Sequence, residues 1–239
     1  SLEANTTGTG NTALGKDALQ SNTTAGNNTA IGLDAATAST TADNITAIGA
    51  SALMTNTGGT DTTAVGAFAL KLNTSGDANC AFGRSSLNNN TTGDDNCAFG
   101  KNSLAANTTA DDNTAFGHYA LATTTTGSAN VAVGALALDA NTTAISNVAV
   151  GYNALSTSTT ASYNTAVGRA AGRDTTTGAQ NTCVGYFAGA NITTGTNNLL
   201  LGYQVGHAGT PGGVITTGSN NVVLGDNSIQ NLFCADTTI

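Results

Sequence analysis

The sequence predicts an all-β solenoid, in which a short repeated segment winds into stacked coils. A five-residue box of the form Asn-Thr-Ala-x-Gly recurs thirteen times, and its first twelve glycines keep one constant spacing, from Gly15, Gly32 and Gly49 onward to Gly202. The residue before each box Gly is apolar, and the residue before that is Ala in ten copies. Pro occurs once and Trp is absent, and the abundant Thr, Asn and Gly favour strands and turns over helices.

The repeat also predicts how the chain is divided. Residues 1–202 are expected to form the regular 17-residue array. The last two boxes are six residues further apart than the others, which predicts an irregular loop over residues 203–218 that contains the single proline, Pro211. Residues 219–239 are expected to form the last coil and a C-terminal transition segment, with Ile229, Leu232 and Phe233 capping the end.

Each repeat is expected to contain two strands of about five residues and two turns, which together complete one coil. In the copy that ends at Gly117, Asn113 is expected to join a ladder of stacked amides, and Gly117 to form a corner at positive φ. Ala115 is assigned to a surface of close approach, while Phe116 and Leu121 are assigned to two columns of the core.

A coil of this size is thin, which predicts self-association. Each repeat offers only two large apolar side chains, whereas ordering its backbone costs about 1–2 kcal/mol per residue. Rods are therefore expected to pair or trimerise laterally through the Ala column, with three chains the preferred number.

The charge of the chain argues against several partners. The net charge is −8 with only six Lys and Arg residues, so neither nucleic acid nor an anionic membrane is expected to bind. The sequence contains no apolar run of about 20 residues and begins with no charged-then-apolar leader, so neither a membrane span nor a signal peptide is expected. The four cysteines are too irregularly placed to predict a disulfide framework.

No catalytic constellation is evident, and no enzyme activity is expected. His118 and His207 are the only histidines and lie in distant repeats. Asp77, Asp94 and Asp111 recur at one position of consecutive repeats, where stacked carboxylates would repel each other. Either solvent screens them or a bound Ca²⁺ relieves the repulsion.

Two further groups of side chains recur in register. Cys80 and Cys97 occupy equivalent positions and are expected to be small buried thiols rather than a disulfide. Aromatic residues follow the box Gly in several repeats and are expected to pack against the next turn or chain, with a glycan platform as the alternative. These residues are Phe68, Tyr119, Tyr152, Tyr186, Phe187 and Tyr203.

The box resembles repeats of two groups of proteins. The segments Asn164–Gly168 and Ala154–Leu155, with an intervening Thr-Thr-Gly pattern, are similar to repeats of phage and giant-virus fibre proteins that precede a C-terminal intramolecular chaperone of the endosialidase type. The segment Leu224–Cys234 resembles the junction that leads into such a chaperone. A looser resemblance is to the head repeats of trimeric autotransporter adhesins, which have a shorter period. Both resemblances imply a trimeric extracellular rod, and the first implies that a chaperone is lost on maturation.

The sequence is thus interpreted as a structural fibre segment, either the shaft or the receptor-binding part of a virion tail fibre. The expected partners are further copies of the chain, a host surface glycan or receptor, and other virion or filament proteins at the ends. A bacterial surface adhesin or extracellular filament subunit is the alternative. Ice binding by a Thr column is a more distant one.

Overall fold

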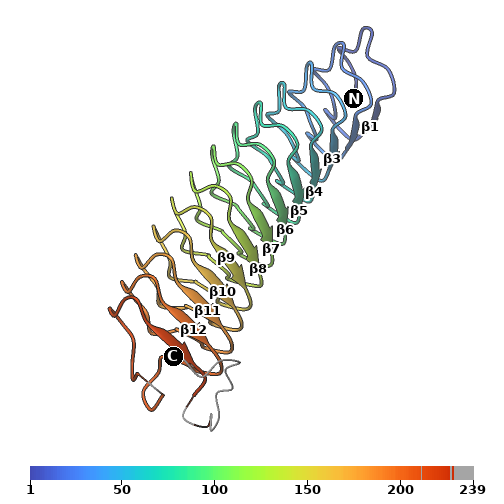
Figure 1. Ribbon diagram of the computed structural model, residues 1–239. Helices are drawn as coiled ribbons and strands as arrows, with labels where there is room; N and C mark the ends of the chain where they lie inside the picture. Colours follow the sequence, from blue (N-terminus) through green and yellow to red (C-terminus); the bar gives the residue numbers. More distant parts are fainter. Residues whose placement is uncertain (211, 227, 229–239) are drawn as a thin grey trace, which may run out of the picture.

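The computed structural model describes residues 1–210, 212–226 and 228, and it confirms an all-β solenoid (Figure 1). The described residues include no helix and form one parallel sheet of thirteen strands, whose order in space follows the order in the sequence. The strands are β1 (Thr12–Leu14), β2 (Thr29–Ile31), β3 (Thr46–Ile48), β4 (Thr63–Val65), β5 (Cys80–Phe82), β6 (Cys97–Phe99), β7 (Thr114–Phe116), β8 (Val131–Val133), β9 (Val148–Val150), β10 (Thr165–Val167), β11 (Thr182–Val184), β12 (Leu199–Leu201) and β13 (Val222–Leu224). Coils are numbered below by the strand that each contains.

The strands pair in the register that the repeat predicts. In β7 and β8, Ala115 lies opposite Ala132, and Phe116 lies opposite Val133, one repeat further along the chain. The same offset holds from β1 to β12, and it lengthens between β12 and β13, where Leu199 lies opposite Val222. Equivalent side chains therefore stack in columns along the rod.

Each coil contains one strand of three residues rather than the two longer strands expected. The Ala-Leu segment forms a turn instead, and Leu121 in this turn has a φ of 51°. This left-handed conformation is costly for a side chain of this kind, but it directs Leu121 into the rod, where it is fully buried. The second core column is confirmed, although a turn and not a strand carries it.

The sides assigned to Ala115 and Phe116 were wrong. Ala115 is completely buried inside its own coil, whereas Phe116 is 53% exposed. Successive side chains of a strand point to opposite faces, and the narrow interior already contains the Leu column, so only a small residue fits inward. Since the Ala column is covered by its own chain, it cannot be the surface through which rods approach one another.

Two ladders of asparagine side chains fill the rest of the interior. The Oδ1 atom of Asn96 accepts the backbone N–H of Asn113 at 3.1 Å, and the Asn113 Nδ2 atom donates to the carbonyl of Gly127 at 2.9 Å. This confirms the expected amide ladder. A second ladder lies before the Thr-Thr pair, where Asn90 Nδ2 donates to Asn73 Oδ1 at 2.9 Å. Both ladders place amides where the turns would leave buried backbone groups unpaired.

The cross-section changes toward the C-terminal end. The inward Ala is replaced by Cys183 in β11 and by Leu200 in β12, and Gly189 and Gly206 stand where earlier coils have Leu. A Cβ atom at Gly206 would lie 2.6 Å from Leu200 Cδ2. The volume left by the missing Leu side chain at Gly206 is therefore filled by the larger side chain of Leu200.

The insertion does not interrupt the ladder of coils. The backbone N–H of Thr193 donates to the carbonyl of Thr216 at 2.8 Å, across the longer connection between β12 and β13. Pro211 and the expected capping residues Ile229, Leu232 and Phe233 lie outside the described residues.

Candidate binding surfaces

The sheet leaves a long outward surface along one side of the rod (Figure 1). We call this surface the outer sheet face, and it consists of the first and third residues of each strand. The third residue is apolar in every strand, and eight of the thirteen are more than a third exposed. These eight are Leu14, Ile48, Phe116, Val133, Val167, Val184, Leu201 and Leu224. The column assigned to the core from its apolar character is therefore a surface column.

Aromatic rings stack in the middle of this face. The ring centroids of Phe82 and Phe99 are 4.6 Å apart, and those of Phe99 and Phe116 are 4.8 Å apart. Cys80 and Cys97 lie beside the rings at the first position of their strands, where both are half-buried and form no disulfide. Burial raises the pKa of both thiols. They are neutral side chains of an apolar surface.

One border of the outer sheet face carries half of the acidic residues of the chain. We call this border the amino flank, and it consists of the two residues before the box Asn in each coil, such as Asp94 and Asp95. The Asp94 Oδ1 atom accepts the backbone N–H of Asp77 at 2.8 Å, and Asp111 Oδ1 accepts that of Asp94 at 2.8 Å. The three aspartates predicted to stack thus do so, and each is tied to the preceding coil.

This arrangement gives no support to a calcium site. Across residues 1–210, 212–226 and 228, no group of three or more His, Cys, Asp or Glu side chains is placed to hold a metal ion. One oxygen of Asp77, Asp94 and Asp111 is used by a backbone amide. We therefore treat the acidic column as a charged border of the sheet face.

The opposite border carries cations and exposed aromatic residues. We call it the carboxyl flank, and it consists of the residue after the box Gly in each coil. Arg84, Lys101 and His118 occupy it in coils 5, 6 and 7, and all three are exposed. Neither Arg84 nor Lys101 forms an ion pair with a residue that the structure describes.

In coils 9–12 the carboxyl flank becomes a continuous stack. The Arg169 guanidinium lies 5.7 Å from the ring centroid of Tyr152 and 5.5 Å from that of Tyr186. It also donates a hydrogen bond to the hydroxyl oxygen of Tyr186 at 2.9 Å, and the rings of Tyr186 and Tyr203 stack at 5.3 Å. The predicted packing of these aromatic residues against the next turn is observed, yet Tyr152 and Tyr203 remain 47% and 57% exposed.

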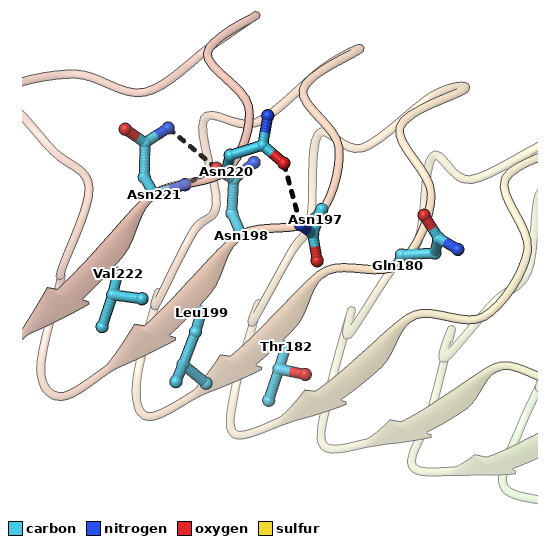
Figure 2. Close-up of a pocket in the computed structure, with 8 residues that line it drawn as sticks. All are labelled: Gln180, Thr182, Asn197, Asn198, Leu199, Asn220, Asn221 and Val222. Atoms are coloured by element: carbon cyan, nitrogen blue, oxygen red, sulfur yellow. Dashed lines mark hydrogen bonds between the residues drawn. The ribbon is translucent and has the colours of Figure 1, made fainter.

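A shallow hollow of about 310 Å³ lies on the amino flank of coils 11–13 (Figure 2). Gln180, Asn197 and Asn220 form its outer wall, while Thr182 and Leu199 of the outer sheet face form another part. Asn197 Nδ2 donates to Asn220 Oδ1 at 2.8 Å. The hollow offers amide groups next to apolar side chains and carries no titratable group.

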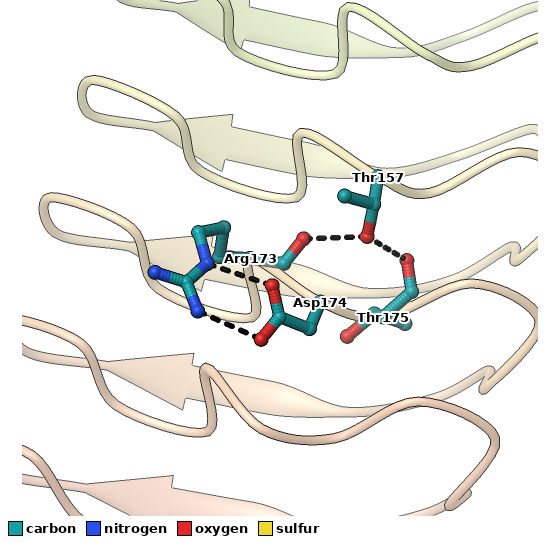
Figure 3. A network of polar contacts seen from close by, with 4 residues as sticks. All are labelled: Thr157, Arg173, Asp174 and Thr175. Atoms are coloured by element: carbon teal, nitrogen blue, oxygen red, sulfur yellow. Dashed lines mark hydrogen bonds and ion pairs between the residues drawn. The ribbon is translucent and has the colours of Figure 1, made fainter.

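The polar residues that follow the Ala-Leu turn stabilise the fold by bonding neighbouring coils to each other (Figure 3). The Thr157 hydroxyl is within hydrogen-bonding distance of the carbonyl oxygens of Arg173 and Thr175, at 2.7 and 3.2 Å. Arg173 makes a bidentate pair with Asp174, with both N–O distances at 2.7 Å. These contacts hold neighbouring turns together and use most of the local polar groups.

The Thr-Thr segments likewise serve the fold. The Thr108 hydroxyl donates to the carbonyl of Thr125 at 3.1 Å, and Thr91 makes the same bond to Thr108 at 2.9 Å. The hydroxyl group of the first Thr in these pairs is therefore bonded along the rod. On the outer sheet face, Cys80, Cys97 and Val131 interrupt the Thr column, and the stacked Phe rings lie in the column beside it.

The two histidines do not come together. His118 is exposed on the carboxyl flank with its ring 4.4 Å from that of Tyr119, whereas His207 lies in the insertion with its ring 6.3 Å from that of Phe187. No described helix is long and apolar enough to cross a membrane.

Sequence reasoning missed two features. The second Asn ladder was visible as an Asn directly before the conserved Thr in seven of the thirteen repeats. The separation of charge between the two flanks follows from the short strand, because Asp95 and Lys101 bracket β6 at its two ends.

Comparison with known proteins identifies no matching family model, curated protein or solved structure.

Proposed function

We propose that this protein is a structural fibre segment that works as a parallel homotrimeric rod on the outside of a virion or cell. The observation that carries the proposal is the outer sheet face. Thirteen strands stacked at about 4.8 Å give a face about 60 Å long, with an apolar side chain at the third position of every strand. This apolar column runs the whole length of the face and eight of its thirteen side chains are more than a third exposed, and large exposed apolar patches of this kind mark interaction sites.

Further copies of the same chain suit this surface. The face is straight, periodic and built from the same columns throughout, so that an identical face matches it over its whole length. The face alone covers about 600 Å² per chain if it is about 10 Å wide, and the two flanks bring this to the roughly 800 Å² per partner of a stable interface. Three chains with their faces toward a common axis would bury the Phe82, Phe99 and Phe116 stack.

A tail fibre of a virion is the assembly that we favour. Its support is the resemblance of the Asn-Thr-Ala-x-Gly repeats and of Leu224–Cys234 to chaperone-dependent viral fibres. In this role the solenoid transmits force along its backbone ladder, and it presents Tyr, Asn and Asp side chains to a host surface. A bacterial adhesin remains the alternative assembly for the same rod.

Two measurements test the proposal. Sedimentation equilibrium of residues 1–239 should give the mass of three chains, and negative-stain electron microscopy should show rods about 60 Å long. A folded monomer at micromolar concentration would reject the fibre. Sequencing of the source DNA beyond the codon for Ile239 should reveal a chaperone domain, and an export anchor there would favour the adhesin instead.

A further inference from the structure

The two flanks carry different side chains at the same level of the rod. In coil 5 the amino flank has Asp77 and the carboxyl flank has Arg84; in coil 6 these are Asp94 with Asp95, and Lys101. In a single chain each flank stacks like charges along the axis. At about 5 Å in water, each adjacent pair costs somewhat less than 1 kcal/mol.

Uncharged side chains on the two flanks also match at the same level of the rod. In coil 9 the amino flank exposes Ile145 at 37%, and the carboxyl flank exposes Tyr152 at 47%. In coil 10 the amino flank exposes Tyr163 at 57%, and the carboxyl flank has the Arg169 guanidinium. Apolar residues thus lie level with apolar residues, and a cation lies level with an aromatic ring.

At the C-terminal end a hollow lies level with protruding side chains. Gln180 and Asn197 bound the hollow on the amino flank of coils 11 and 12, and Asn220 continues it to coil 13 (Figure 2). Tyr186 and Tyr203 project from the carboxyl flank of the same two coils, 38% and 57% exposed. A tyrosine ring has the amphipathic character of a hollow lined by amides and an apolar strand.

We propose that copies of this chain associate in parallel and in register, with the amino flank of each coil against the carboxyl flank of the same coil in a neighbouring copy. This inference rests on the proposed self-association and specifies its geometry. A rotation axis along the rod always brings one flank of a chain against the other flank of its neighbour, for two chains or for three. An axis perpendicular to the rod, by contrast, would run the chains antiparallel and place like flanks together.

The match selects the register as well as the direction. A shift by one coil would set Lys101 against Asp77 or Asp111 and would keep some attraction. It would, however, move Tyr163 away from Arg169, and a shift toward the N-terminal end would also move Tyr186 out of the hollow. Asp43 and Asp61 have no cation level with them, so the charges alone would leave the register loosely defined.

A charge-exchange experiment tests the contact between flanks. Lys101→Asp should weaken association about tenfold or more at low salt, because like charges then face each other. The double substitution Asp94→Asn with Asp95→Lys should weaken association similarly. Asn at residue 94 keeps the Oδ1 acceptor for the backbone N–H of Asp77. Lys is acceptable at residue 95 because Tyr163 and Gln180 have the same positive φ at the equivalent position. All three substitutions together should restore association.

Lys71→Asp is the matched control. It makes the same charge change at a residue that belongs to neither flank, where the Lys71 amine lies 5.6 Å from the ring centroid of Phe68. Association constants come from sedimentation equilibrium, and circular dichroism checks that every variant is folded. Equal weakening by Lys71→Asp and Lys101→Asp, or no recovery in the exchanged variant, overturns the inference while the fibre proposal stands. A monomeric wild type rejects the fibre proposal and, with it, this geometry.

Crosslinking tests the register directly. We would combine Ile145→Cys with Tyr152→Cys in a chain whose four native cysteines are replaced by alanine. These two positions bracket β9 and lie more than about 10 Å apart within one chain, so mild oxidation should link only neighbouring copies and give covalent oligomers on non-reducing gels. The control combines Ile145→Cys with Tyr186→Cys, two coils or about 10 Å out of level. Crosslinking of the control as efficiently as of the level pair would overturn the in-register arrangement.

Discussion

The buried Oδ1 atom of Asn107 has no hydrogen-bond donor, because Thr124 and not Asn stands at the same place in the next coil. Asn107 itself donates through Nδ2 to Asn90 Oδ1 at 2.8 Å. On the other side of the gap, Asn141 Nδ2 donates to Thr124 Oγ1 at 3.2 Å. This amide ladder is therefore interrupted at Thr124, as it also is at Ser39 and Ser158, and the interruption at Thr124 leaves an unpaired acceptor inside the rod.

Thr124→Asn should close this gap and stabilise the protein. The new Nδ2 group would donate to Asn107, and the new Oδ1 would accept from Asn141. One recovered buried hydrogen bond contributes about 1 kcal/mol to the free energy of unfolding. Urea unfolding at one fixed protein concentration measures it. Thr124→Ala is the opposite change and should destabilise the rod, because it also removes the acceptor of Asn141; equal stability of the two variants would contradict the ladder.

The box glycine should be intolerant of any side chain. Gly117 has a φ of 149°, and a Cβ atom there would lie 2.5 Å from the carbonyl oxygen of Gly134 in the next coil. Since the obstacle is backbone, the two coils must separate locally. Gly117→Ala should lower the midpoint of thermal unfolding by several degrees, with a loss of about 2 kcal/mol or more.

Gly58→Ala is the matched control for that prediction. A Cβ atom at Gly58 would meet nothing within 4 Å. This variant should keep or slightly raise the stability of the wild type, since alanine restricts the unfolded chain more than glycine does. Comparable losses at the two sites would show that stacked glycines are not required.

The spacing of the box was sufficient to predict the solenoid, the parallel register and the amide ladder. These features depend on the period alone, because identical residues at a fixed interval must stack wherever the coils do. Asn113, Gly117 and Leu121 accordingly have the roles predicted for them. The Ala-Leu turn was harder to predict from the sequence, because Leu121 has a positive φ there, which leucine ordinarily avoids.

The sides of the strand could not be predicted from hydrophobicity. Alternation shows that Ala115 and Phe116 point to opposite faces, but it does not say which face is enclosed. The more apolar residue was assigned inward by the usual rule. In this fold the enclosed space is limited by the short length of each coil, and the smaller side chain occupies it. The Phe column is therefore exposed and is a candidate interface. A count of apolar residues in one repeat does not show which of them are exposed.

Coil 12 offers a test of how the interior volume is shared. Leu200 fills the inward position of β12, and Gly206 leaves room for it. Gly206→Leu alone should clash with Leu200 and destabilise the rod by about 1–3 kcal/mol. Leu200→Ala alone should cost about 2–5 kcal/mol through the cavity it leaves. The double variant restores the arrangement of coil 7 and should be more stable than either single variant; additive losses in urea unfolding would contradict shared packing.

The buried thiol of Cys183 should make stability fall at high pH. Burial raises its pKa from 9.0 to about 12, so the folded state holds this proton more tightly than the unfolded state does. Below pH 9 the thiol is neutral in both states and costs nothing. Between pH 9 and about 12 only the unfolded chain ionises, and the free energy of unfolding therefore falls as the pH rises through this window.

Cys183→Ala removes this proton linkage and isolates its contribution. The variant starts from a lower stability because it loses a packed sulfur atom. Its unfolding free energy should nevertheless decline less steeply above pH 9, and the difference should reach the order of 1–2 kcal/mol by about pH 10.5. In native wild-type protein a thiol reagent should also react with Cys183 only as fast as the rod opens, since the thiolate is the nucleophile. Parallel pH profiles for wild type and variant would show that the sulfur contacts water in the folded rod.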